Sequence, residues 1–358
     1  MSKQLKILVS PLDWGLGHAT RLVSLLRYLE KQHHHLLIGV NTLTSDFLKE
    51  QFPEATFYQL PSYNISYSNS GSPLTNLKLI PKILKAKKAE NNWVKNFLQS
   101  NKVDLIISDS RFGFHHPSVP SVIISHQLSL QFPKAYSFLG HLAQRVNEKW
   151  LQEFDQIWVP DTEYHFLSGE LSKNKKLQGY YLGSQSRFSP SNAPNPLGKE
   201  YILCLLSGPE PQRTKFEELL LKQAPSINNH LVIIGGKPHQ QKKHQDHENL
   251  TYFSHLHDDA MVNYIQNALW VVSRSGYSSL MDYQALGCKR VFLVPTPGQT
   301  EQIYLAQRMK ELKICDYGIQ DSLDLSKIES QSTSFTGFHL HQPIKHTFQN
   351  IIIDMMTH

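Results

Sequence analysis

A short segment near residue 275 combines residue types that suit the binding of a phosphate. Ser273-Arg274-Ser275-Gly276 follows the apolar run Trp270–Val272 and precedes a helical pattern whose first turn carries small hydroxyl side chains. Backbone N–H groups and the positive end of a helix dipole converge at such a strand-to-helix turn and favour an anion. Asp282 lies six residues after the glycine, where its carboxylate could accept hydrogen bonds from both ribose hydroxyls of a nucleotide. We therefore expect a nucleotide diphosphate at this turn.

The loop that follows the next apolar run, Val291–Val294, adds amides and a carboxylate. Gln299, Glu301 and Gln302 lie in or just after a segment rich in Pro and Gly, and they could hydrogen-bond to sugar hydroxyls. Each of these features also has a purely structural explanation, because a serine-rich turn often only caps a helix and an aspartate can simply lie on a helix surface. Their joint order and spacing favour a ligand site.

A glycine turn near the N-terminus carries the leading candidate for a general base. The apolar run Leu5–Ser10 is followed by Asp13, Gly15, Gly17 and His18. An imidazole, with a pKa near neutrality, can take a proton from an acceptor hydroxyl at the working pH. Asp13 is the competing base, or the partner that orients His18. In the structural alternative, the glycines allow a tight turn and the histidine caps the helix.

Two further polar segments, 108–113 and 124–127, follow apolar runs of strand length. The carboxyl ends of parallel strands meet at one edge of a sheet, so these side chains could point into the same cleft. The predicted acceptor-binding residues are Gly15, Gly17, Asp109, Arg111 and His126.

Strand-length apolar runs alternate with helix-length segments along the whole chain. In the first half these runs are Leu5–Ser10, Leu36–Val40, Val103–Ser108, Val119–Ser125 and Gln156–Pro160. In the second half they are Tyr201–Leu206, His230–Ile234, Leu250–Phe253, Leu269–Ser273 and Arg290–Val294. This alternation is typical of parallel sheets with helical crossovers. The predicted fold class is α/β, with two Rossmann-like domains in tandem.

The segment 186–199 separates the two halves and contains three prolines and a glycine. Its composition predicts a linker, which places an N-terminal domain at 1–185 and a C-terminal domain at 200–358. The composition, 40% hydrophobic and 18% charged, is ordinary for a globular protein. A chain of 358 residues is longer than one hydrophobic core of ordinary size would hold, so we expect two domains.

Composition also bounds the compartment and the partners. Three cysteines without metal-ligand spacing argue against a disulfide framework or a zinc site and favour a reducing compartment. No window approaches the roughly 20 apolar residues of a spanning helix, and no signal peptide is apparent. We predict a cytoplasmic protein. The formal charge of +6 suits anionic ligands or an anionic membrane surface and is too small to indicate nucleic acid.

The segment 74–102 is basic and amphipathic. It carries seven lysines and one acid, Glu90, interleaved with leucine, isoleucine and tryptophan. Such a segment could rest on anionic lipid at the inner face of the membrane. A solvated surface helix with a core-facing stripe explains the pattern equally well.

The C-terminal motif resembles glycosyltransferase family 28. The resemblance rests on Ser-Arg-Ser-Gly, the acid six residues after the glycine, and the Val-Pro loop ending in Glu-Gln before an alanine, and it is strongest from Asn249 to Ala306. Within the family, the pattern is most similar to the bacterial enzyme that adds N-acetylglucosamine to a lipid-linked muramoyl peptide. The resemblance implies a GT-B fold whose domains face a cleft, a UDP-sugar donor, inverting chemistry, and no metal or other cofactor.

The resemblance also implies roles for individual residues. Ser275 and Gly276 would lie near the diphosphate, Asp282 on the ribose, and Glu301 and Gln302 on the donor sugar. The nucleobase would contact main chain near His255 and Leu256. In the loop 207–213, two prolines replace family glycines, although Arg213 could still offer a fork of donors to phosphate. The complete predicted donor site is Ser207, Gly208, Arg213, His255, Leu256, Ser275, Gly276, Asp282, Gln299, Glu301 and Gln302.

The glycine turn at His18 resembles the Gly-Gly-His turn of the same family, so the sequence predicts sugar transfer to an acceptor, which the resemblance suggests is lipid-linked. A UDP-sugar hydrolase that uses water as acceptor is the alternative. An epimerase of the same fold, or a nucleotide-sugar binding module without activity, is more distant.

Overall fold

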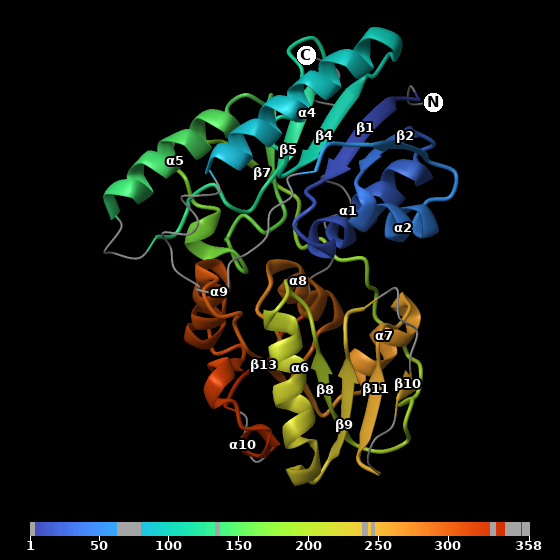
Figure 1. The fold of residues 1–358 in the computed structure, drawn as a ribbon, viewed down its shortest axis with the longest axis vertical. Helices are drawn as coiled ribbons and strands as arrows, with labels where there is room; N and C mark the ends of the chain where they lie inside the picture. Colours follow the sequence, from blue (N-terminus) through green and yellow to red (C-terminus); the bar gives the residue numbers. More distant parts are fainter. Residues whose placement is uncertain are drawn as a thin grey trace. The chain divides into compact units, whose positions relative to one another are not determined.

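A computed structural model of the chain describes residues 4–62, 80–132, 137–237, 243–244, 248–329, 334–340 and 352. The described residues divide into two compact units (Figure 1). The first unit comprises the described residues up to Arg187 together with Ile352, and the second comprises those from Phe188 to Leu340. The segment 186–199, which the sequence predicts as a linker, contains no helix or strand.

The first unit is built on a parallel sheet in the order β3-β2-β1-β4-β5-β6-β7. Its strands are β1 (Lys6–Pro11), β2 (His35–Val40), β3 (Thr56–Gln59), β4 (Leu105–Asp109), β5 (Ser121–Ile124), β6 (Gln156–Val159) and β7 (Gly179–Tyr181). The central strands are buried along nearly their whole length, as expected when helices cover both faces of a parallel sheet. This double burial explains why they read as continuous apolar runs.

Helices α1 (Leu16–Lys31) and α2 (Thr42–Gln51) pack on one face of this sheet, in a core that contains Ile7, Val9 and Ile107. Helices α4 (Ile80–Ser100) and α5 (Ser137–Leu151) cover the opposite face. A short 3-10 turn, η2 (Gly169–Leu171), precedes β7. The buried positions of α1 recur at Leu22, Leu25, Leu26 and Leu29, the spacing that predicted this helix.

The second unit repeats the design, with strand order β10-β11-β9-β8-β12-β13-β14. Its strands are β8 (Tyr201–Leu205), β9 (His230–Ile234), β10 (Lys243–His244), β11 (Leu250–Phe253), β12 (Trp270–Ser273), β13 (Val291–Leu293) and β14 (Asp316–Tyr317). Only the β10–β11 pair is antiparallel among the described strands. Its helices are α6 (Gln212–Gln223), η3 (Ala224–Ser226), α7 (Asp258–Gln266), α8 (Tyr277–Leu286), α9 (Thr300–Glu311), η4 (Gln320–Ser322) and α10 (Leu325–Glu329). Helices α6 and α10 pack on one face of the sheet (Figure 1).

In both sheets the strand order reverses beside the first strand. In the first unit β1 lies between β2 and β4, and in the second β8 lies between β9 and β12. In doubly wound sheets generally, the loops on the two sides of such a reversal diverge to opposite faces and leave a crevice at the carboxyl edge of the strands. Ligands of doubly wound sheets bind at this position.

These two sheets confirm the predicted α/β class. Every strand-length apolar run identified in the sequence forms a strand, whereas the short edge strands β3, β7, β10 and β14 were missed. The C-terminal assignment differs at one described residue: Ile352 was placed in the second domain, but its side chain is buried in the α1 core of the first unit.

Arg111 fastens α4 to the sheet of the first unit. Its fully buried guanidinium lies 2.6 Å from the Glu90 carboxylate and donates to the carbonyl oxygens of Pro11 and Pro61 at 2.6 and 3.3 Å. The other Glu90 oxygen accepts from the backbone N–H of Gly113 at 3.1 Å. The one acid of the basic segment is thus a core residue of α4.

We predict that Glu90→Ala lowers the free energy of unfolding of the first unit by about 3–5 kcal/mol, because it leaves the Arg111 charge buried without its carboxylate. The matched control is Glu170→Ala, which removes the acid of the surface pair Glu170–Lys173 and should cost less than about 1 kcal/mol. Urea unfolding followed by fluorescence measures both. Equal losses in the two variants would contradict the structural role of Glu90.

Candidate active site

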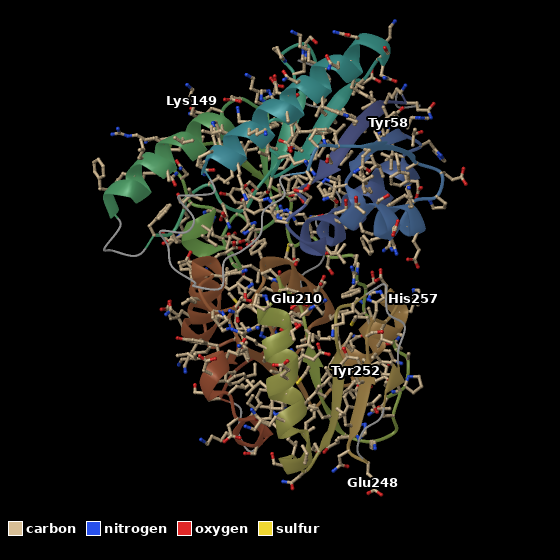
Figure 2. The ribbon with its side chains drawn as sticks, in the orientation of Figure 1. Tyr58, Lys149, Glu210, Glu248, Tyr252 and His257 are labelled. Atoms are coloured by element: carbon tan, nitrogen blue, oxygen red, sulfur yellow. The ribbon has the colours of Figure 1, made fainter. Side chains whose placement is uncertain are left out.

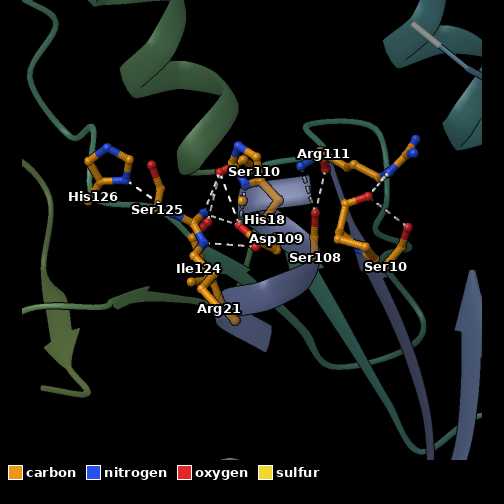
Figure 3. Close-up of polar contacts among 12 residues, drawn as sticks. Ser10, His18, Arg21, Ser108, Asp109, Ser110, Arg111, Ile124, Ser125 and His126 are labelled. Atoms are coloured by element: carbon orange, nitrogen blue, oxygen red, sulfur yellow. Dashed lines mark hydrogen bonds and ion pairs between the residues drawn. The ribbon is translucent and has the colours of Figure 1, made fainter. Parts of the chain in front are cut away.

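His18 and Asp109 form a hydrogen-bonded pair at the reversal point of the first sheet (Figure 3). Asp109 is the last residue of β4, and His18 lies in the first turn of α1, which follows β1. The His18 Nδ1 lies 3.1 Å from Asp109 Oδ1. The carboxylate is fully buried, whereas 22% of the imidazole side chain is exposed. Asp109 is therefore an internal support, and His18 is the member that can meet a ligand.

The protonation of the pair follows from its surroundings. Burial opposes ionisation of Asp109, but the charge of Arg21 and the hydrogen bond from His18 hold the pKa of this carboxyl well below its usual range. An ionised carboxylate only accepts hydrogen bonds, so the His18 Nδ1 must donate. The lone pair of His18 is therefore on Nε2. Burial also lowers the pKa of His18, with Asp109 opposing this effect, so the imidazole is uncharged near neutrality.

Asp13 has different partners from those expected. Its carboxylate, 1% exposed, accepts from Asn41 Nδ2 at 3.0 Å and from Ser62 Oγ at 2.6 Å, and it lies 3.9 Å from the Arg111 guanidinium. The sequence offered Asp13 as the residue that orients His18, but the carboxylate hydrogen-bonded to His18 Nδ1 is that of Asp109. The signal that could have identified it is strand order, since β4 pairs with β1 and ends beside the glycine turn.

The other predicted acceptor-side residues lie in the same unit. Gly15 has a φ of 122°, a conformation that favours glycine, and it precedes α1 directly. Gly17 lies within the first turn of α1, and its carbonyl accepts from Thr20 Oγ1. His126 is 6% exposed and neighbours Arg21. Because the side chains of Asp109 and Arg111 are fully buried, we interpret both as supports of the site. Acceptor binding at Gly15, Gly17 and His126 stays a prediction.

In the second unit, the two predicted halves of the donor site are joined by hydrogen bonds. Ser275 Oγ donates to the backbone carbonyl of Gln302 at 2.8 Å, which links the turn before α8 to the first turn of α9. The Gln302 amide accepts from the backbone N–H of Thr296 at 2.8 Å and donates to Gln299 Oε1 at 2.6 Å. Gln302 is therefore committed to shaping the loop, and Gln299 is the amide better placed to meet a ligand.

Gly276 leaves open space at the N-terminus of α8. Its φ of −68° is available to any residue, and a methyl group added there would meet only Ser279 Oγ, at 3.8 Å. The first turn of α8 contains no acidic side chain. Neither the backbone nor the neighbours require glycine, so the space beside it can admit a ligand oxygen to the positive end of the helix.

The loop after β8 lies against the loop after β13. Gly208 has a φ of 97°, and a Cβ there would lie 3.6 Å from Thr296 Oγ1. Arg213, predicted as a phosphate ligand, directs its guanidinium to the Glu210 carboxylate and to the Gly236 carbonyl at 2.9 Å. A phosphate would have to compete with Glu210 for this side chain. Ser207 begins the same loop, directly beyond the buried Leu206.

Arg274 is a structural residue of the donor site that the sequence did not single out. Its side chain is buried with the guanidinium carbon 4.2 Å from the centroid of the Phe216 ring, and burial lowers its pKa to about 10. It donates to carbonyls at Gln212 and Val294 and to Gln320 Oε1, at 3.0, 3.2 and 2.6 Å. One guanidinium thus ties together segments that follow β8, β13 and β14. Its position inside Ser-Arg-Ser-Gly was the available signal.

The remaining predicted donor residues lie at the same edge of the sheet. His255 and Leu256 follow β11, with the His255 ring 6.2 Å from that of His257. Asp282 is half-buried in α8, and Glu301 is half-buried in the first turn of α9. Ten of the eleven predicted residues belong to loops or first helical turns that follow strands of one sheet, and Asp282 lies in the second turn of α8.

Across the described ranges, no group of three or more His, Cys, Asp or Glu side chains is arranged to hold a metal ion. Cys204, Cys288 and Cys315 are free thiols and are buried. No helix in the described part of the chain is both long and apolar enough to cross a membrane.

Comparison with known families settles the class of the second unit. The family model described as "Glycosyltransferase family 28 C-terminal domain" matches residues 209–342. The match contains the turn at Ser275, Asp282 and the loop that ends at Gln302, and it confirms the family 28 resemblance inferred from these residues.

Solved structures that are similar to this chain over nearly its whole length show the fold of both units. The glycotransferase of kitacinnamycin is 14% identical with a TM-score of 0.67, and the match covers 99% of this chain and 96% of that protein's chain. The calicheamicin glycosyltransferase is 14% identical with a TM-score of 0.64, at 99% and 95% coverage. MurG of Acinetobacter baumannii is 13% identical with a TM-score of 0.54, at 99% and 95% coverage. The fold is GT-B, as predicted.

No sequence among curated proteins matches this chain. The family 28 match together with the GT-B fold confirms the predicted enzyme class, a glycosyltransferase. Such an enzyme transfers a sugar from a nucleotide-sugar donor to an acceptor.

We predict that Gly276→Ala leaves the fold intact and removes donor binding. The methyl group would meet no protein atom closer than 3.8 Å, so the melting temperature of the free protein should stay within about 1 °C of the parent value. The stabilisation that a nucleotide sugar adds through binding should disappear. A thermal-shift panel of nucleotide sugars measures both effects.

Gly287→Ala, at the other end of α8, is the reciprocal control. Its φ of 64° and the Leu340 side chain 3.0 Å from the added Cβ predict a lower melting temperature with the ligand increment retained. A Gly276→Ala protein that still gains full stability from the ligand would contradict a diphosphate site at this turn.

Proposed function

We propose that this protein is a metal-independent, inverting glycosyltransferase that moves a sugar from a UDP-sugar to a hydroxyl acceptor. The observation that carries the proposal is the pair His18–Asp109, a partly exposed imidazole whose Nε2 lone pair is fixed by a fully buried carboxylate. A nucleotide-binding module needs no such base. The family 28 domain supplies the donor side of the reaction.

The proposed reaction is a single displacement. His18 Nε2 takes the proton of the acceptor hydroxyl as its oxygen attacks the anomeric carbon, and the bond from that carbon to the diphosphate oxygen breaks. UDP leaves with the bonding electron pair. Asp109 stabilises the imidazolium that forms, and attack opposite the leaving group inverts the anomeric configuration.

Charge on the departing diphosphate can be neutralised without a metal ion. The N-terminus of α8 presents backbone N–H groups and the positive end of the helix dipole beside the open space at Gly276. Asp282 would bind the ribose, and Gln299 and Glu301 the sugar. We expect activity to survive treatment with a chelator. Activity that vanishes with chelator and returns with a divalent ion would refute metal independence.

His18→Ala and Asp109→Asn should each lower kcat by about 10²–10⁴-fold, because general base catalysis has this magnitude. His116→Ala, a histidine in the loop after β4, is the matched control and should leave kcat unchanged. Since burial lowers the pKa of His18, the base form persists below the ordinary histidine range and is lost only at still lower pH. The profile of kcat/KM against pH should therefore be flat around pH 7 and fall on the acid side below about 6.5.

Incubation with UDP-sugars separates transfer from the alternative, hydrolysis. With no acceptor present, a transferase releases UDP slowly, whereas rapid stoichiometric release of free sugar would establish a hydrolase. With an acceptor, proton NMR of the product reads the anomeric configuration, and retention would contradict the single displacement.

We further propose that the acceptor is lipid-linked and that the first unit meets an anionic membrane through α4 and α5. On α5, Phe138, Leu142 and Val146 repeat at four-residue spacing and are exposed, Phe138 by 82%. Arg145 and Lys149, the latter labelled in Figure 2, flank this stripe, and α4 exposes Lys82, Lys85 and Lys88. Lys87 joins the two helices through Glu153 and through the Trp150 ring. Apolar side chains bordered by lysines suit the interface of an anionic bilayer.

Several side chains in the second half of α4 face the core, as expected for a surface helix with a core-facing stripe. Trp93 stacks on Phe97 at 4.9 Å between centroids, and Val94 is fully buried. The apolar component of the proposed membrane surface is therefore the α5 stripe together with Leu84 of α4, which is 49% exposed. The predicted leucines before residue 80 lie outside the described residues.

A Phe138→Ser/Leu142→Ser variant should lose most of its co-sedimentation with anionic vesicles at low salt, because two exposed apolar anchors are removed. Ile319→Ser, which changes an exposed apolar residue of the second unit, should bind vesicles like the parent protein. Absence of vesicle binding by the parent protein, or equal binding by all three proteins, would eliminate this surface.

A further inference from the structure

Arg21 contacts three members of the first-unit site at once (Figure 3). It lies one turn after His18 on α1, and its side chain is buried. Its Nε donates to Asp109 Oδ2 at 2.9 Å, and its Nη2 contacts both Asp109 Oδ1 and Ser110 Oγ, the latter at 3.2 Å. The other terminal nitrogen, Nη1, lies 3.2 Å from His126 Nδ1. The same carboxylate oxygen, Oδ1, therefore serves both Arg21 and His18.

The chemistry of guanidinium fixes the tautomer of His126. Arginine remains protonated and offers only N–H donors, so the nitrogen that faces it must accept. His126 Nδ1 therefore carries the lone pair, and its proton resides on Nε2. His18 has the opposite arrangement, since its Nδ1 donates to Asp109. The two imidazoles of the site are thus held in opposite tautomers.

Arg21 also changes what Asp109 does to His18. A carboxylate alone beside an imidazole favours its charged form, which is no longer a base. Here the fork of Arg21 compensates the Asp109 charge across two oxygens. The charged and titratable groups that act on His18 are Asp109 from β4, Arg21 from α1 and His126 from the segment after β5. Burial, Arg21 and His126 together outweigh Asp109, and the pKa of His18 lies below its ordinary value.

We propose that Arg21 is a positioning residue that keeps His18 an uncharged base and holds His126 as an Nε2–H donor. The catalytic part rests on the proposed function, whereas the tautomers do not depend on any activity. The planar guanidinium group is essential to this role, because its nitrogens reach Asp109 and His126 at the same time. A lysine would keep the charge but lose the shared geometry.

The direct test reads the imidazole nitrogens of the unmodified protein. Long-range proton–nitrogen NMR at pH 7.5 distinguishes the two neutral tautomers and the imidazolium, and His18→Gln and His126→Gln spectra assign the signals. We expect protonated Nδ1 in His18 and protonated Nε2 in His126. An Nδ1-protonated His126, or a charged His18 at this pH, would overturn the proposal whether or not the protein transfers sugar.

The second test compares profiles of kcat/KM against pH. Arg21→Gln should move the acid limb upward by about one pH unit, because Asp109 then acts on His18 without compensation. Arg21→Lys should keep the limb within a few tenths of a unit of the parent position and lower kcat. Arg27→Gln, on the same helix but bound to Arg187 and Gln51, should match the parent protein. If the acid limb of the Arg21→Gln profile stays at the parent position, the proposal is overturned. If this variant fails to fold, the NMR measurement of the two histidine tautomers in the unmodified protein decides the proposal.

Discussion

The reversal of strand order beside the first strand of each sheet is the constraint on which both halves of the site depend. It separates the loops on either side of β1 and of β8 and leaves the carboxyl edge accessible. In the first unit His18, from the first turn of α1, and Asp109, from the end of β4, meet at this edge. In the second unit the turn at Gly276 lies at the corresponding edge, and the hydrogen bond from Ser275 to Gln302 connects this turn to the first turn of α9. The same topology thus positions the proposed base on one sheet and the proposed anion site on the other.

Two buried arginines of the first unit show how similar ion pairs take different roles. Arg111 and Glu90 join α4 to the sheet and are both fully buried, so their pairing secures packing. Arg21 and Asp109 are equally sheltered, but the carboxylate also meets a partly exposed imidazole. The partial exposure of His18 distinguishes the Arg21–Asp109 pair, which we interpret as support for the proposed base, from the packing pair of Arg111 and Glu90. Arg274 is also buried, and its hydrogen bonds to Gln212, Val294 and Gln320 order the loops of the proposed donor site.

The sequence predicted most of the fold because buried parallel strands are continuous apolar runs, and the central strands of both sheets were found in this way. It missed edge strands such as β7, whose three residues are only half-buried and carry no apolar run. It predicted a donor turn at 273–276, within the matched family 28 segment, because the glycine, the hydroxyl side chains and Asp282 are close together in the sequence. It did not pair Asp109 with His18, because a contact across 91 residues depends on strand order. The proximity of Arg21 to His18 could have been predicted, since the two residues are three apart on one helix and therefore share a face.

Hydrogen exchange measured with and without a UDP-sugar tests the central claim most directly, namely that the carboxyl edge of the second sheet binds the donor. The account predicts slower exchange in the segments 206–213, 254–257, 274–282 and 295–302, with little change at the opposite edge of that sheet. Protection absent from all four segments, while the ligand demonstrably binds, would contradict it.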